Sequence, residues 1–463
     1  MTIDTLAEIN DQCAGSSSTP DNAFPDNYLS NRMLQLCNGR NTEKEICEII
    51  CAERSLEGVL LEEDAGNILR EWKSCGYIRV DFAQNLHRSS RADEVLTRRQ
   101  GKPLGVTRLL WDITRKCNLR CLHCYARAGA DWSNELTFDQ IKLTTQKIAS
   151  LMPYIIVLGG GEPFILPNFL DIVAYIKKYT GSRIKVLTNG TLLTDDLIER
   201  MKGLVDFVQF SLDGRKRNHD YLRNSLGSFE KAVSAIERAR SYGIPTGVCM
   251  TLFNQNIADL DWVIDFAIQN KLYKLRISPI IAAGRANDRL NEFVLTPNVT
   301  RRLYATLADL RSLYKDVILL DFRDELYGKA FLSTCLPSKA KEHEGYLLCS
   351  AGRSMLYVNP EGNITPCNFV DYPEYHLGNV KTDSLAGIWN DSPHLKEWRS
   401  LETCHIETCC DCHSRDQCGG GLRCNAISQS GNIKGRDPFC HFYTQKPDIV
   451  SIDMSGNNSS VRE

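Results

Sequence analysis

Three closely spaced cysteines are the residues with the clearest chemistry in this sequence. Cys117, Cys121 and Cys124 follow the pattern C-x3-C-x2-C, directly after an apolar run at 108–113 that predicts a β-strand. Three thiolates can hold one corner of a four-iron cluster, but they leave the fourth iron without a protein ligand. An open coordination position is typical of a reactive metal centre. The alternatives are a zinc site of the Cys3His type that uses His123, or three cysteines on one helical face.

A second group of cysteines lies near the C-terminus. Of the 19 cysteines in this chain of 463 residues, nine fall between Cys349 and Cys440. Because disulfides are rare in the cytosol, clustered cysteines in a cytosolic protein favour metal binding. This group therefore predicts further metal sites.

The composition is typical of a soluble globular protein of two to four domains. Hydrophobic residues make up 43% and charged residues 24%, and the formal net charge is −2. This balance argues against nucleic acid or an acidic membrane surface as the main partner. No apolar run approaches the roughly 20 residues that cross a bilayer, and the polar first 27 residues do not resemble a signal peptide. We therefore expect a cytoplasmic protein.

The middle of the chain alternates predicted strands with helices, as in a parallel sheet. One helix should begin after Thr137, with Gln140 in the capping-box position. Six such units fit either an open sheet or a partial barrel, and periodicity does not distinguish the two. The strands are predicted at 108–113, 154–158, 183–187, 205–211, 246–252 and 273–278.

Ligands gather at the carboxyl ends of parallel strands, and the loops there carry further chemistry. The second strand runs into Gly159–Pro163, where glycines permit close backbone approach to a ligand and Glu162 offers a carboxylate. The third strand is followed by Asn189. The fourth brings Ser211 and Asp213, whose spacing places the hydroxyl and the carboxylate on one side. Together with the cysteine loop, these motifs predict one site.

Residues 105–325 resemble the radical S-adenosylmethionine (SAM) enzymes in the cysteine loop, the Gly-Gly-Glu-Pro motif and the fourth strand. The resemblance implies a partial (β/α)6 barrel whose three cysteines bind a [4Fe–4S] cluster, with SAM chelated to the open iron. It also implies that the reduced cluster cleaves SAM to a 5′-deoxyadenosyl radical, which removes a hydrogen atom from the substrate. The residues implied in SAM binding are His123, Gly160, Gly161, Glu162, Pro163, Asn189, Ser211 and Asp213.

Residues 335–445 resemble the SPASM extension of this family, which holds auxiliary iron–sulfur clusters. The spacing between the last two cysteines of its central run is five residues rather than the usual three. The resemblance assigns one auxiliary cluster to Cys409, Cys412, Cys418 and Cys440. It assigns the other to Cys349, Cys367 and Cys424, with Cys335 as the candidate fourth ligand. Without Cys335 that cluster would have an open iron for substrate. Zinc ribbons are the alternative for the whole group.

The N-terminal region is predicted to hold a small winged-helix-like domain at 28–82. In it, one helix ends at Asn38-Gly39, a second opens at Thr42, and a strand follows at 77–80. This domain resembles the peptide chaperone of pyrroloquinoline quinone synthesis, whose relatives bind a leader peptide as an added strand. A plain docking domain or a nucleic-acid-binding winged helix are the alternatives. The remaining segments are a disordered region at 1–27, a linker at 83–104 and a tail at 446–463.

These resemblances predict an enzyme that modifies a ribosomally synthesised peptide. The alternative is radical modification of a small molecule or tetrapyrrole side chain in haem-type cofactor biosynthesis. An interaction module with purely structural clusters is a third hypothesis. A flavodoxin- or ferredoxin-type protein is the expected electron donor. Arg285 is expected either to meet a carboxylate of substrate or cofactor, or to lie in a surface loop.

Overall fold

The structure is a computed structural model, and it describes a small N-terminal sheet and a large main body. The described residues are 38–42, 44–46, 78–80, 85–88, 106–129, 134–153, 155–293, 295–314, 317–322, 347, 349–412, 415 and 419–440.

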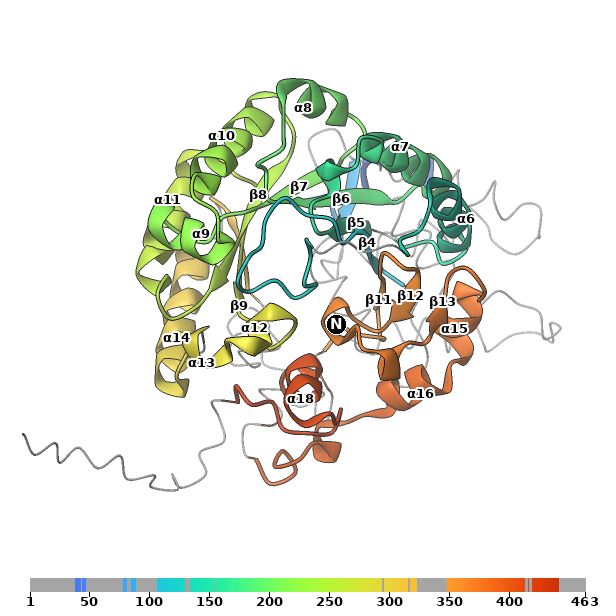
Figure 1. Ribbon diagram of the computed structural model, residues 1–463, viewed down its shortest axis with the longest axis vertical. Helices are drawn as coiled ribbons and strands as arrows, with labels where there is room; N and C mark the ends of the chain where they lie inside the picture. Colours follow the sequence, from blue (N-terminus) through green and yellow to red (C-terminus); the bar gives the residue numbers. More distant parts are fainter. Residues whose placement is uncertain are drawn as a thin grey trace, which may run out of the picture.

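A ten-stranded sheet organises the main body (Figure 1). Its order is β10-β9-β8-β7-β6-β5-β4-β11-β12-β13, and all neighbours from β10 to β11 are parallel. All six predicted strands are present and curve around a central space, which confirms the partial barrel. They are β4 (Arg108–Thr114), β5 (Ile155–Gly160), β6 (Arg183–Thr188), β7 (Phe207–Ser211), β8 (Thr246–Leu252) and β9 (Lys274–Pro279). A further parallel strand, β10 (Leu319–Phe322), pairs with β9.

Helices cover the outer face of this barrel (Figure 1). The first begins after Thr137, whose side chain accepts from the Gln140 N–H as predicted, while the Gln140 side chain accepts from the Thr137 N–H. The outer helices are α6 (Phe138–Ala149), α7 (Phe169–Thr180), α8 (Asp195–Met201), α9 (Lys216–Arg223), α10 (Ser228–Ser241), α11 (Leu260–Gln269) and α14 (Pro297–Leu313). Two short helices, α12 (Arg285–Asp288) and α13 (Leu290–Phe293), follow β9. No described helix is both long enough and apolar enough to cross a membrane.

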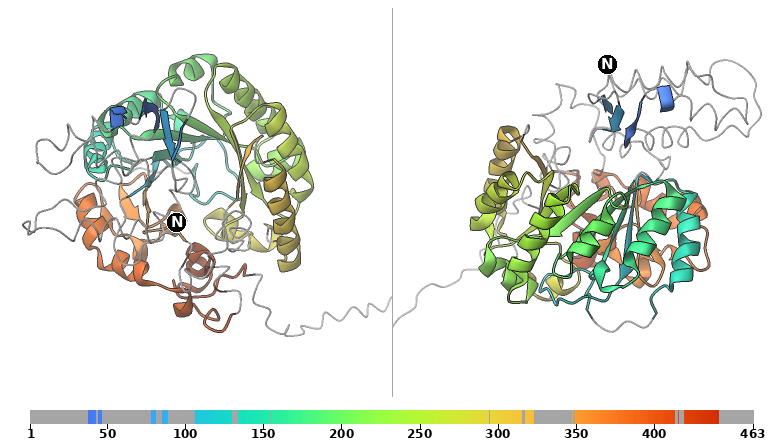
Figure 2. Two further views of the ribbon diagram at one scale, coloured as in Figure 1. Left: turned by 180° about the vertical axis from the view of Figure 1, so that it is seen from behind. Right: turned by 90° about the horizontal axis from the view of Figure 1, so that it is seen from above.

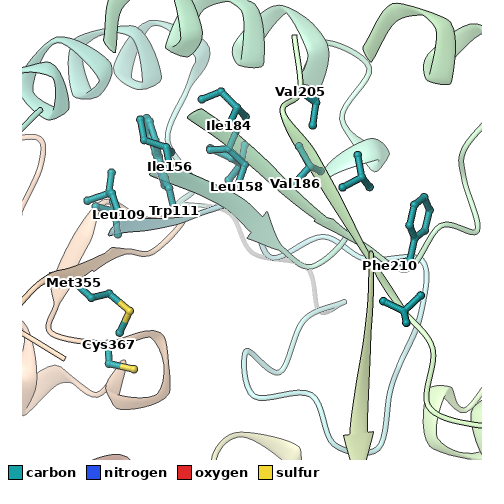
Figure 3. Packing of buried hydrophobic residues seen from close by; sticks show 14 of the residues in the cluster. Leu109, Trp111, Ile156, Leu158, Ile184, Val186, Val205, Phe210, Met355 and Cys367 are labelled. Carbon is teal, nitrogen blue, oxygen red and sulfur yellow. The ribbon is translucent and has the colours of Figure 1, made fainter. Parts of the chain in front are cut away.

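The alternation of side chains along the strands separates a dry core from an inner cavity. Ile156, Leu158 and Val186 have no solvent exposure and belong to the main hydrophobic core (Figure 3). Burying a side chain of this size contributes about 1.5–3 kcal/mol. Their strand neighbours Val157 and Lys185 instead line the cavity inside the barrel.

The C-terminal region continues the same sheet rather than forming a separate layer. Its first strand pairs with β4 so that Met355 lies beside Arg108 and Val358 beside Trp111. Antiparallel strands then carry the sheet outward. The elements are β11 (Met355–Val358), β12 (Asn363–Thr365), β13 (Gly378–Asn379), α15 (Leu385–Asp391), α16 (Pro393–Ser400) and α18 (Arg423–Ser430). The two predicted domains therefore share one backbone framework.

The N-terminal pieces form a three-stranded antiparallel sheet in the order β1-β3-β2, visible in the right-hand view of Figure 2. Its strands are β1 (Asn38–Thr42), β2 (Ile78–Val80) and β3 (Asn85–Arg88). The helix predicted to end at Asn38-Gly39 lies outside the described residues, and β1 begins at Asn38. Residues 44–46 are helical, next to the predicted opening of the second helix at Thr42, and β2 coincides with the strand predicted at 77–80. The linker prediction is wrong at 85–88, because these residues pair with β1 and β2 as a strand. The rest of the winged-helix assignment lies outside the described residues, as do 1–27 and 446–463.

Candidate cluster and cofactor site

A cavity of about 790 Å³ lies inside the barrel. Its wall combines the cysteine loop, the carboxyl ends of β5 to β7 and parts of the C-terminal region. Cys117, Cys121 and Cys124 all line it, and so do Cys349 and Cys367 from the C-terminal group. The structure thus brings two predicted cysteine sets, more than 200 residues apart in sequence, to one cavity.

Each sulfur of the cysteine loop has an N–H donor. The Leu119 backbone donates to Cys117 Sγ (3.4 Å), and the Ala128 backbone donates to Cys124 Sγ (3.4 Å). Arg223 Nη1 donates to Cys121 Sγ (3.8 Å). Such donors stabilise thiolates, whereas burial alone raises the pKa of the Cys117 thiol to about 12. A bound metal removes that proton outright.

The donor set suits a four-iron cluster with one open iron. Cys121 and Cys124 lie close enough to Cys117 to raise its pKa, and all three cysteines line the cavity. Three thiolates can each bind one iron of such a cluster and leave the fourth without a protein ligand. The described cysteines are also free thiols. The residues present therefore suit an iron–sulfur cluster at Cys117, Cys121 and Cys124.

The glycines after β5 bring two loops together. Gly161 donates to Thr114 O (2.7 Å), and the next residue donates to Lys116 O (2.9 Å). A Cβ on Gly160 would lie 2.2 Å from Thr114 O, and one on Gly161 would lie 2.1 Å from Lys116 O. We predicted that these glycines admit a ligand. The structure adds a second role, because they let the loop press against the backbone that leads into Cys117.

Glu162 faces away from the cavity and braces the neighbouring strand. It is fully buried, and its carboxylate accepts from Thr188 Oγ1 (2.8 Å), the Asn189 N–H (2.8 Å) and the Phe164 N–H (3.3 Å). Burial raises its pKa to about 7, although these hydrogen bonds oppose the shift. Gly160 and Gly161 of the same motif do line the cavity, while Pro163 is buried at the start of a short 3-10 helix.

Asn189 joins β6 to the cysteine loop. Its Nδ2 donates to Asn118 Oδ1 (3.0 Å), and its Oδ1 accepts from the backbone and hydroxyl of Thr191 (2.8 and 2.6 Å). Asn118 in turn donates to the same hydroxyl (2.7 Å). Asn189 also lines the cavity, so a bound ligand would meet a side chain that is already fixed by the cluster loop.

Asp213 is paired with an arginine that sequence reasoning missed. Asp213 is fully buried, and its carboxylate accepts from Arg223 Nε (2.7 Å) and the Thr251 N–H (3.0 Å). Burial opposes ionisation, but Arg223 together with the nearby histidines and the Thr251 N–H lowers the pKa of Asp213. Ser211 lines the cavity, as does Arg223, whereas Asp213 lies behind them. Arg223 is near the end of α9 and belongs to no spacing pattern, so only the tertiary structure reveals it.

His123 presents a neutral ring to the cavity. Burial and the nearby Arg223 lower its pKa to about 3. Its Nδ1 is buried and has no hydrogen-bond partner among the described residues. A buried polar atom that faces a cavity without a partner suits contact with a bound ligand.

Arg285 supports the cysteine loop. Its Nε donates to Cys121 O (2.8 Å) and its Nη1 to Ala128 O (3.0 Å), while its backbone N–H donates to Cys124 O (2.9 Å). The side chain is partly buried and lines the cavity. The prediction of a surface-loop arginine is therefore wrong, and the described partners are backbone carbonyls rather than a carboxylate.

A carboxylate with two tyrosine partners connects the barrel to the C-terminal region. Asp112 of β4 lines the cavity and accepts from Tyr125 Oη (2.9 Å) and Tyr357 Oη (2.8 Å). Burial raises its pKa to about 6, and the two hydroxyls oppose the shift. The ring of Tyr125 also meets Phe369 edge-on, 5.2 Å between centroids. Sequence reasoning missed this cluster because its members come from three distant segments.

The inner wall of the barrel also carries cations. Lys185 donates to Gln209 Oε1 (2.6 Å), while Lys274 and Arg276 share Asp321 (2.5 and 3.1 Å). Burial, Lys274 and Arg276 together lower the pKa of Lys185 well below its usual range. Lys185, Lys274 and Arg276 line the cavity, whereas Asp321 does not.

The C-terminal cysteines fall into two groups. Cys424 joins Cys349 and Cys367 in lining the cavity. Cys412 and Cys440 lie close enough to Cys409 to raise its pKa, which burial brings to about 11. The assignment of these two groups to two clusters stays a prediction. Cys335 and Cys418 lie outside the described residues, so their ligand roles stay predictions.

Comparisons with known proteins place these observations in a family. Residues 111–267 match the model of the radical SAM superfamily, and residues 349–413 match the SPASM iron-sulfur cluster-binding domain. Fe-coproporphyrin III synthase of Methanosarcina barkeri is 28% identical over 352 residues, covering 72% of this chain and 87% of that protein. The mycofactocin maturase MftC of Mycobacterium ulcerans is 28% identical over 338 residues, with coverage of 72% and 87%.

Solved structures show the same fold. SuiB of Streptococcus suis, bound to S-adenosylmethionine, superposes with a TM-score of 0.61 at 16% identity, over 85% of this chain and 89% of that one. A radical SAM domain binds a [4Fe–4S] cluster with SAM, and a SPASM domain holds auxiliary iron–sulfur clusters. The chain therefore carries a radical SAM domain at residues 111–267 and a C-terminal SPASM domain at residues 349–413.

Proposed function

We propose that this enzyme modifies a ribosomally synthesised peptide by removing a hydrogen atom from it. The observation that carries the proposal is the antiparallel sheet of β1, β3 and β2, which offers strand edges beside a radical SAM core. An extended leader peptide can be held by adding a strand to such an edge. The maturase MftC supports the assignment as a relative, and the structure of SuiB with its precursor peptide shows this fold beside a peptide.

In this proposal Cys117, Cys121 and Cys124 hold the cluster. When bound, the cluster supplies the electron that cleaves SAM into methionine and the 5′-deoxyadenosyl radical that takes a hydrogen atom from the substrate. Gly160, Gly161, Asn189, Ser211 and the His123 ring line the space for SAM.

The remaining site residues orient this arrangement from behind. Glu162 fixes the backbone of β6 at Asn189, and Asp213 fixes Arg223 beside Cys121. Asp112 and its two tyrosines hold the C-terminal region against the cavity. The narrow, largely apolar cavity excludes water from the reacting groups. A flavodoxin- or ferredoxin-type protein in the cytoplasm would supply the electrons.

Deuterium transfer tests the proposal directly. Reduced holoenzyme is incubated with SAM and a deuterated peptide encoded beside its gene, and 5′-deoxyadenosine is analysed by mass spectrometry. Deuterium in 5′-deoxyadenosine together with a lighter or crosslinked peptide is the expected result. Formation of 5′-deoxyadenosine without deuterium, and with unchanged peptide, would contradict a peptide substrate.

The cationic inner wall favours a second candidate, a carboxylate-bearing tetrapyrrole. Lys185, Lys274 and Arg276 would suit several carboxylates of one small molecule, and the pre-heme d1 synthase of Dinoroseobacter shibae is a relative, 25% identical over 360 residues. Lys185→Met should then raise KM for a tetrapyrrole without changing substrate-free SAM cleavage. An unchanged KM, or no turnover of the tetrapyrrole, would leave the peptide as the substrate.

A further inference from the structure

Two buried arginines in the C-terminal region have no carboxylate partner among the described residues. Arg353 is 9% exposed and Arg399 is 8% exposed. Arg353 Nη2 donates to Leu401 O (2.8 Å), while Arg399 donates through Nε to Gly352 O (2.7 Å) and through Nη1 to Trp389 O (2.7 Å). All of these acceptors are neutral backbone carbonyls.

The two guanidinium groups also keep unused donors. Arg353 Nε and Arg399 Nη2 are buried without a hydrogen-bond partner among the described residues. Burial lowers the pKa of Arg399 to about 10, and the neighbouring Arg353 lowers it further. Arginine nevertheless stays protonated in proteins, so two like charges lie close together in a buried place. A buried charge of this kind is costly unless an anion compensates it.

The missing negative charge points to the cysteines beside these arginines. Arg353 is close enough to Cys349 for a thiolate there to favour the charged guanidinium. Gly352, whose carbonyl Arg399 holds, donates its own N–H to Pro366 O (3.3 Å), next to Cys367. Both cysteines line the cavity. Arg353 thus lies in the turn that follows Cys349, and Arg399 of α16 is hydrogen-bonded to the same turn.

We infer that Arg353 and Arg399 are the counter-cations of the auxiliary iron–sulfur cluster held by Cys349, Cys367 and Cys424. A cluster with thiolate ligands carries net negative charge, and it becomes more negative on reduction. Buried cations beside it favour the reduced form and raise its reduction potential. The inference rests on the ligand set proposed for that cluster and is independent of which substrate the enzyme modifies.

The first measurement is an EPR-monitored redox titration of the reconstituted holoenzyme. Arg399→Met keeps the length of the apolar stem but removes the charge, so the midpoint potential of the auxiliary signal should become more negative. Arg399→Lys keeps the charge and should hold the potential near the wild-type value. Lys396→Met is the matched control, because it removes an exposed cation from the same helix, α16. It should leave the potential unchanged.

The second measurement compares the unfolding of the cluster-free and loaded forms. Without the cluster, Arg353→Met removes an uncompensated buried charge, so its Tm should equal or exceed that of the wild type. With the cluster, the gain in Tm on loading should be smaller than in the wild type. This reversal separates a counter-cation from an arginine that merely ties backbone carbonyls together, which would lose stability equally in both forms.

Two outcomes would overturn the inference. A potential that stays unchanged in both Arg353→Met and Arg399→Met would show that the charges do not act on the cluster. Persistence of the auxiliary signal and full iron content in Cys349→Ala would overturn the ligand set and the inference together. Neither result would touch the peptide proposal, which the deuterium experiment tests separately.

Discussion

The two cysteine sets that meet at the cavity differ in the arginines that lie near them. Near Cys121, Asp213 balances the charge of Arg223 at 2.7 Å, while Arg285 donates to backbone carbonyls of the cysteine loop. In the C-terminal region, Arg353 and Arg399 donate to backbone carbonyls, Arg399 also lies 4.2 Å from the centre of the Trp389 ring, and neither has a carboxylate partner among the described residues. Buried cations favour the reduced form of a cluster. The comparison therefore predicts that the auxiliary cluster is more easily reduced than the cluster at Cys121.

The largest expected effect is on SAM cleavage, which should depend on the cysteine loop but not on the C-terminal cysteines. Cys121→Ala should abolish formation of 5′-deoxyadenosine, because SAM loses the cluster that binds it. Cys349→Ala should retain SAM cleavage. Both are checked by chromatography of 5′-deoxyadenosine and by iron content, which should fall by about four per chain for each lost cluster. Unchanged turnover in Cys121→Ala would contradict the radical mechanism.

Removing Asp213 from its pair with Arg223 should lower the free energy of unfolding more than removing an arginine that has no carboxylate partner. Asp213→Asn leaves Arg223 buried without its anion, and we expect a loss of about 3–5 kcal/mol in the free energy of unfolding of the cluster-free protein. Asp213→Asn with Arg223→Met should recover much of that loss. Urea unfolding measures both variants. If Asp213→Asn proved as stable as the wild type, Asp213 would not be the group that compensates the buried charge of Arg223.

The stability of the fold should depend on pH through His219, which lies beside Asp213. This buried imidazole accepts from the Asp213 N–H (3.2 Å), and burial lowers its pKa to about 4. Below the unfolded-state pKa of about 6.5, the unfolded chain binds a proton that the folded one does not. Stability should therefore fall by about 3 kcal/mol as pH drops from 6.5 to 4. His219→Gln should flatten this part of a stability–pH profile measured by urea unfolding. An unaltered slope in this variant would show that another group causes the loss of stability.

A smaller effect is expected where the loops touch. Gly161→Ala places a methyl group 2.1 Å from Lys116 O, so the cysteine loop must shift. We expect a loss of about 1–3 kcal/mol, comparable to other overpacked sites, together with weaker cluster retention. Gly181→Ala is the control, because its φ of 63° is strained but nothing lies within 4 Å of its Cβ. Thermal unfolding and iron content check both, and equal iron loss in the two variants would contradict a specific loop contact.

The sequence by itself determined the local features of this protein. The cysteine spacing, the Gly-Gly-Glu-Pro motif and the six βα units were predictable because they depend on residues near one another in the chain. The same locality explains the error at 85–88, where residues predicted as a linker pair with β1 and β2 as a strand. It also explains why the C-terminal cysteines could be grouped but not located relative to the barrel.

Only the tertiary structure decided how charge and contact are distributed around the cavity. Met355 pairs with Arg108 across 247 residues of chain, and this pairing brings Tyr357 to Asp112 and Cys349 to the cavity. The sequence shows that Glu162 supplies a carboxylate, but only the fold shows that this carboxylate accepts a hydrogen bond from Thr188 of β6. Such contacts arise because distant strands pair in one sheet, and short-range sequence patterns do not predict this pairing. The cysteine loop can therefore be predicted from the sequence, whereas the charged groups and contacts around it depend on the fold.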